Sequence, residues 1–182
     1  SLALTGRDAA RLAEVAGAIE QMSRRMERSI EQTGVGPEQM TAPTRQWRAW
    51  FAWLAERDNL EAYVAAIGRG MAMFESAAGA AGRRETIIIE FRPMQHLYKM
   101  QTRAGRATIQ MPTPMVRFGG AALEAMAGLI FRRDKAAKRT IVEEMRGEAY
   151  QDLASEFEAL GGVVERTLGA LHDLAESFER VN

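Results

Sequence analysis

The fold class is decided by one stretch of the sequence, residues 86–112, TIIIEFRPMQHLYKMQTRAGRATIQMP. Its first part, residues 86–91, is rich in β-branched and aromatic side chains, which predicts a strand. Residues 95–101 and 106–111 then alternate between apolar and polar side chains, which predicts a β-hairpin. Gly105 lies between these two arms and supplies the positive φ that a tight turn needs.

A short edge strand is predicted to follow the hairpin at residues 115–118, after Pro112 and Pro114 interrupt the second arm. Together these strands predict a small antiparallel sheet over about residues 86–118. Such a sheet needs other elements to cover its apolar face.

Apolar residues recur at three- and four-residue steps on both sides of this sheet, which predicts amphipathic helices. The predicted helices cover residues 5–33, 44–57, 60–78 and 121–132, and after Asp134 the chain is expected to be helical nearly to its end. Helices on both sides of a small sheet indicate an α+β fold. We expect one domain, residues 1–182, made of a helical sub-region 1–82, the sheet at 83–118 and a helical sub-region 119–182.

The composition is that of a folded protein and excludes several classes of function. The chain has 182 residues, 47% of them hydrophobic, and no Cys, which excludes a disulfide scaffold and Cys-bound metal centres. No apolar run approaches the roughly 20 residues that span a bilayer, so we expect a cytoplasmic protein without a membrane partner. Arg outnumbers Lys 21 to 3, a balance associated with GC-rich bacterial genomes.

The strongest periodic pattern is a heptad-like seam between residues 150 and 181. Nine of its ten positions are apolar, Thr167 being the exception, and the seam is about 48 Å long if the helix is continuous. Gly161 and Gly162 provide a place where it breaks into two helices. The candidate interface residues on this seam are Tyr150, Leu153, Phe157, Leu160, Val164, Leu171, Leu174 and Phe178.

The positions that flank the seam are mostly small or apolar, so its buried face is wider than a two-stranded coiled coil requires. This favours packing into a helical bundle, with the helix at residues 5–33 as the natural neighbour. Part of the seam is alternatively a homodimer interface or a surface for a protein partner.

The sequence contains no recognisable catalytic or cofactor motif. His96 and His172 have none of the spacings of helix-borne metal sites, and nucleophile-elbow, P-loop and dinucleotide-binding motifs are absent. Glu144, Glu148 and Asp152 are four residues apart and share a helix face, which is most simply a solvated surface. We therefore predict no cofactor, no metal site and no catalytic residue, and keep an enzyme without a recognisable motif as one alternative.

The formal net charge of zero conceals a strong division along the chain. Residues 83–139 carry 12 basic and 4 acidic side chains, or +8, whereas residues 140–182 carry 3 basic and 10 acidic ones, or −7. The candidate residues for binding an anion or nucleic acid are Arg103, Arg106, Arg132, Arg133, Lys135, Lys138 and Arg139. The acidic C-terminal segment is an alternative partner for this basic region, within one chain or across a dimer.

These patterns lead to a ranked set of functional hypotheses. The first is a non-enzymatic interaction or assembly protein that uses the helical seam to associate with itself or with a partner. The second is a nucleic-acid-binding module formed by the basic region 83–139. Trp47, Trp50 and Trp53 fit base stacking in such a module, but their spacing is more typical of core anchors.

Overall fold

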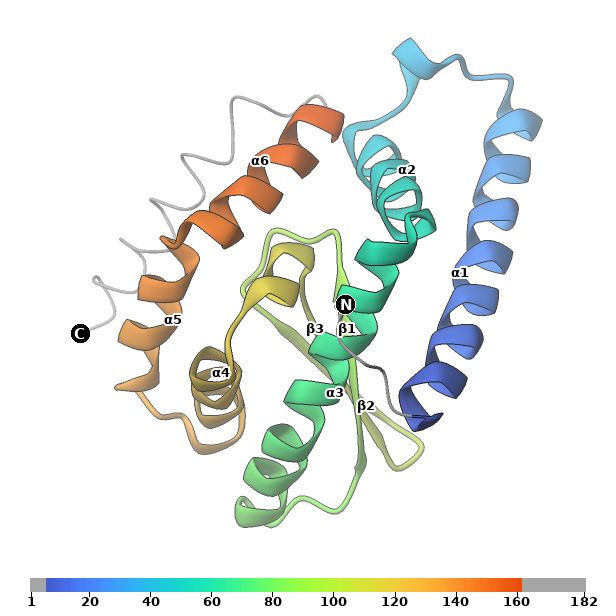
Figure 1. Ribbon diagram of the computed structural model, residues 1–182. Coiled ribbons are helices and arrows are strands. Elements are labelled where there is room, and N and C mark those ends of the chain that lie inside the picture. The colour runs from blue at the N-terminus through green and yellow to red at the C-terminus, as the bar shows by residue number, and fades with distance from the viewer. Residues whose placement is uncertain (1–5, 162–182) are drawn as a thin grey trace.

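The computed structural model describes residues 6–161, and residues 1–5 and 162–182 lie outside this range. Within it, six α-helices and two short 3-10 helices pack around a three-stranded sheet (Figure 1). The helices are α1 (Gly6–Thr33), α2 (Ala42–Ala55), α3 (Arg57–Ala80), α4 (Gly120–Arg132), α5 (Ala137–Met145) and α6 (Glu148–Gly161), with 3-10 helices η1 (Pro37–Gln39) and η2 (Thr113–Arg117). The strands are β1 (Thr86–Arg92), β2 (Lys99–Arg103) and β3 (Arg106–Pro112). The predicted α+β fold class is confirmed.

The boundaries of two predicted helical segments differ in detail from the prediction. The second helix begins at Ala42, earlier than predicted, because the side chain of Thr41 accepts a hydrogen bond from the backbone N–H of Thr44. Over the described residues the chain after Asp134 is mostly helical, as predicted, with a break between α5, which ends at Met145, and α6, which begins at Glu148.

The sheet is mixed, which corrects the prediction of an antiparallel sheet. The strand order is β1-β3-β2; β3 is antiparallel to β2 but parallel to β1, with Ile89 beside Ile109. β3 takes the central position because Ala107, Ile109 and Met111 are fully buried. β2 carries mostly exposed polar side chains and therefore suits the edge of the sheet.

The hairpin is confirmed, and its turn is tighter than predicted. Arg103 and Arg106 are opposite each other in the register, so only Ala104 and Gly105 form the turn. Both have positive φ, 48° and 72°, which is the geometry of a type I′ turn.

The strand predicted at residues 115–118 is absent from the described sheet, and this prediction is wrong. Residues 113–117 instead form η2, with Met115 and Val116 buried against the core. Pro114 has no N–H to donate to a sheet ladder and its fixed φ suits the first turn of a helix.

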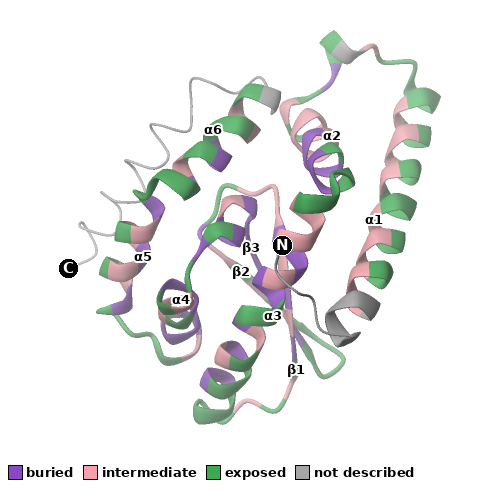
Figure 2. Cartoon of the chain, viewed as in Figure 1, coloured by how far each residue is buried: buried purple, intermediate pink, exposed green. Residues whose placement is uncertain are grey.

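The main core lies between α3, the sheet and α4. Ile87, Ile89 and Phe91 of β1 are buried on one face, next to the buried side chains of β3 (Figure 2). Gly70 lets α3 approach this face closely, since a Cβ there would lie 3.2 Å from Cδ1 of Ile89. Trp50 and Trp53 are also buried, which confirms their interpretation as core anchors.

The turn geometry leads to a prediction about stability. Replacing Ala104 with Asn should raise the free energy of unfolding by about 0.5–1 kcal/mol, because Asn tolerates positive φ and Asn-Gly is the preferred type I′ pair. Chemical denaturation measures this change. Gly105→Ala is the matched control and should destabilise the protein, since Ala is strained at φ 72°. A loss of stability in Ala104→Asn would contradict the turn assignment.

Candidate functional site

The described part of the seam packs inside the chain. Tyr150 and Leu153 of α6 are buried, and the ring of Phe157 lies 5.6 Å from that of Trp53 in α2. Tyr150 also contacts Phe118, at 5.8 Å between ring centroids, and burial raises the pKa of the Tyr150 hydroxyl to about 12. These three seam residues therefore contribute to the core of the chain itself.

Over the described part of the seam, the neighbouring helix is not the one predicted. α6 packs against α2 and η2, whereas α1 packs against α2 and α3, so α2 stands between α1 and α6 (Figure 1). Helical periodicity identifies an apolar face but not the helix that covers it. Leu160 lies near the end of α6, and Val164, Leu171, Leu174 and Phe178 lie outside the described residues, so their interface role stays a prediction.

The first candidate site is an apolar groove between the C-terminal half of α1 and the N-terminal half of α2. It has a volume of about 590 Å³. Its apolar lining, which defines the α1–α2 groove, is Met22, Met26, Ile30, Val35, Met40, Pro43, Trp47 and Phe51. Met22 and Val35 are 43% and 37% exposed and are the exposed large hydrophobic residues of the described part of the chain.

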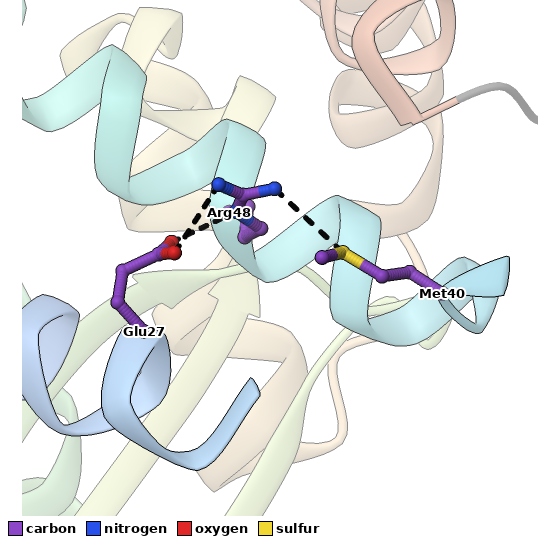
Figure 3. A network of polar contacts seen from close by, with 3 residues as sticks. All are labelled: Glu27, Met40 and Arg48. Atoms are coloured by element: carbon purple, nitrogen blue, oxygen red, sulfur yellow. Dashed lines mark hydrogen bonds and ion pairs between the residues drawn. The ribbon is translucent and has the colours of Figure 1, made fainter. Parts of the chain in front are cut away.

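One ion pair holds the two walls of the groove together. The guanidinium of Arg48 in α2 donates to both carboxylate oxygens of Glu27 in α1, at 2.8 and 3.2 Å (Figure 3). The same guanidinium lies 3.7 Å from the sulfur of Met40. A second hollow of about 460 Å³ lies beside this pair and shares Met40 and Phe51 with the groove.

The floor of the groove is tied to the sheet through Trp47. The guanidinium of Arg92, at the end of β1, lies 4.7 Å from the centre of the Trp47 ring, within cation–π distance. Trp47 also makes an edge-to-face contact with Trp50, at 5.3 Å between centroids. The groove is therefore supported by rigid elements on its α2 side, while none of the α1 side chains that line it is buried.

The predicted anion-binding residues fall into two separate places. Arg103 and Arg106 flank the hairpin turn, whereas the other candidates lie around the connection between α4 and α5. These two places are on different sides of α3 (Figure 1). The second group consists of Arg132, Arg133, Lys135, Lys138 and Arg139.

The described acidic helix does not cover the basic hairpin. α6 lies against α2 and η2, away from the hairpin turn (Figure 1). Within the basic region, Arg83, Arg92 and Arg139 pair with acidic neighbours in sequence, Glu85, Glu90 and Glu143. Over the residues that the structure describes, the basic hairpin is therefore separate from acidic α6, whereas Arg139 in α5 pairs with Glu143 of the acidic segment.

Two features of these sites were missed by sequence reasoning. Arg83 and Arg84 join Arg103 and Arg106 at the hairpin end, because β1 runs parallel to β3 and begins beside the turn. The α1–α2 groove was also missed, since the sequence predicted only that the apolar residues of the helix at 5–33 share one face. Their spacing gives no signal that this face is only partly covered.

Other forms of chemistry receive no support from the described residues. No group of three or more His, Asp or Glu side chains in the part of the chain that is described could hold a metal ion. His96 is exposed. Glu144, which was predicted to lie on a solvated acidic face, accepts a hydrogen bond from the backbone N–H of Gly119, at 2.9 Å. None of the helices within residues 6–161 is long and apolar enough to cross a bilayer.

Comparisons with protein-family models, with curated proteins and with solved structures find no match to this chain.

The internal role of Phe157 can be tested by mutation. Phe157→Asp should lower the free energy of unfolding by at least about 2 kcal/mol, because it removes the contact with Trp53 and brings a charge to a half-buried position. Urea denaturation followed by circular dichroism measures the change. Glu156→Ala, at an exposed position on the same helix, should have little effect, and equal stability of the two variants would show that Phe157 is dispensable for the fold.

Proposed function

We propose that this protein is a non-enzymatic assembly protein that associates with itself. In this proposal, the seam segment 162–182 of one copy occupies the α1–α2 groove of a second copy. The observation that carries the proposal is the groove itself, where Met22 and Val35 expose large apolar side chains to solvent. Exposed apolar surface of this kind is a common feature of protein–protein binding sites.

The lining of the groove suits an amphipathic helix. Three of its residues, Met22, Met26 and Met40, are methionines, whose flexible side chains adapt to the shape of a partner. A helix that binds in a groove presents apolar residues at three- and four-residue steps. The segment 162–182 has this pattern, with Leu171, Leu174 and Phe178 spaced by three and four.

The position of α6 favours a second copy as the source of the segment. α6 ends at Gly161 on the side of α2 that is opposite to α1, whereas the groove lies between α2 and α1 (Figure 1). A segment from the same chain has to pass around α2 to enter the groove. A reciprocal exchange between two copies avoids this path and gives a symmetric dimer with two equivalent contacts.

Mutational complementation tests this proposal in the full-length chain. The wild-type protein should sediment as a dimer, while Met22→Glu in the groove and Leu171→Glu in the segment should each weaken association at least about 30-fold. A mixture of the two variants should form a heterodimer, because the intact groove of one accepts the intact segment of the other. Analytical ultracentrifugation measures all three samples.

The control for the groove variant is Gln21→Glu, which adds the same charge at an exposed position of α1 outside the lining. It should dimerise like the wild type. A wild-type protein that is monomeric at high micromolar concentration would overturn the proposal. A Met22→Glu variant that still dimerises would overturn the assignment of the groove.

A further inference from the structure

Four arginines from two distant parts of the sequence meet at one end of the sheet. Arg103 and Arg106 are opposite each other across the two-residue turn. Thr86, the first residue of β1, lies beside Arg106 and donates its backbone N–H to the carbonyl of Gly105, at 2.9 Å. Arg83 and Arg84, three and two residues before β1, are thereby held next to the turn. We refer to Arg83, Arg84, Arg103 and Arg106 as the basic turn end.

Arg83 is held in place by its neighbours. Its Nη2 donates to the hydroxyl of Thr102 in β2, at 3.2 Å, and pairs with the carboxylate of Glu85, at 3.0 Å. Its Nε is buried and has no hydrogen-bond partner among the described residues. The guanidinium is therefore fixed across the turn, with one donor that no described protein group uses.

The other three arginines extend into solvent. Arg84, Arg103 and Arg106 are exposed, and no acceptor within residues 6–161 binds their side chains. Glu85 is the acidic residue of this cluster, and hydrogen bonds from its own backbone N–H and that of Arg84 lower the pKa of its carboxyl. Glu85 thus stays ionised near neutral pH, and the cluster has a net charge of +3.

We propose that the basic turn end binds the phosphate backbone of double-stranded nucleic acid. This site is separate from the α1–α2 groove and does not depend on self-association. Arg is suited to the task because its planar guanidinium donates two parallel hydrogen bonds to a phosphate. The turn lies at one end of the three-stranded sheet (Figure 1), where β1 pairs with β3 as far as Arg106. The arginines therefore contact phosphates on the outside of the duplex and need not enter a groove.

The surroundings of the four arginines favour nucleic acid over an acidic protein. A protein interface needs an apolar centre that becomes buried. The residues beside these arginines, Thr102, Ala104 and Gly105, are small or polar and offer none. Phosphate contacts require no such centre, because the release of counterions provides most of the affinity. The turn has no aromatic residue to stack on a base, so binding is expected to be independent of sequence.

Fluorescence anisotropy with a labelled 20-base-pair DNA duplex tests this site in the full chain. Binding should be measurable at low salt and should weaken as salt rises, with a log–log slope of about −3 to −4 if four phosphates are contacted. The triple variant Arg84→Ala/Arg103→Ala/Arg106→Ala should lose at least about tenfold in affinity and reduce the slope to about −1. Glu85→Gln should bind more tightly than the wild type.

Matched variants separate this site from a general effect of charge. Arg24→Ala/Arg57→Ala/Arg146→Ala removes three positive charges from other exposed positions and should bind nearly as well as the wild type. Arg132→Ala/Arg133→Ala/Lys135→Ala, at the other basic group, should also retain binding. Thermal unfolding monitored by circular dichroism confirms that each variant is folded.

Three results would overturn the proposal. The first is undetectable binding of the duplex at about 50 mM salt, where phosphate contacts are strong. The second is an equal loss of affinity in the triple variant and in either of the two comparison variants. The third is displacement of the duplex by polyglutamate at an equal or lower charge concentration, which would assign the arginines to an acidic protein partner.

Discussion

Burial of β3 between β1 and β2 is the constraint on which the rest of this structure depends. Ala107, Ile109 and Met111 need neighbours on both sides and a covered face, and only the central position provides both. The connection at residues 93–98 therefore has to pass the end of β3, which places the polar β2 at the edge of the sheet opposite β1. α3 then covers the apolar face at Gly70, and the chain leaves β3 through η2 into α4.

The same constraint determines where charge collects. Because β1 runs parallel to β3, the start of β1 lies at the hairpin turn, which brings Arg83 and Arg84 beside Arg103 and Arg106. These two pairs are about 20 residues apart in the sequence, and antiparallel pairing of β1 with β3 would have separated them by the length of the sheet. The net charge of zero is thus a property of the composition and does not reflect mutual pairing of the basic hairpin and α6.

The α1–α2 groove has a different origin. α1 packs against α2 and α3 along one side, so its large apolar residues are half-buried or, at Met22, exposed, and none that is described is fully buried. The pair between Glu27 and Arg48 bridges the two helices, and Trp47 and Phe51 supply the apolar floor of the groove. A long helix attached in this way leaves surface that a folded domain normally covers.

The sequence predicts best those features that depend on residues close together in the chain. Helices, the hairpin and the positive φ of Gly105 were predictable, because each depends on residues close in the chain. Three features were not predictable, since each depends on competition between distant partners. They are the parallel pairing of β1, the 3-10 helix at Pro114, and the packing of Tyr150 on Phe118 and of Phe157 on Trp53. For the candidate site, Arg103 and Arg106 were found by their charge, but their association with Arg83 was not.

The sequence by itself determined the α+β class, the hairpin and the separation of basic and acidic segments, because these follow from local periodicity, turn chemistry and residue counts. Only the tertiary structure decided which side of each helix is covered, which strand is central, and which arginines share one end of the sheet. The physical reason is that an amphipathic pattern predicts which face of a helix is buried, but not which element buries it. What buries it, or leaves it open as in the α1–α2 groove, is decided by the packing of the whole chain.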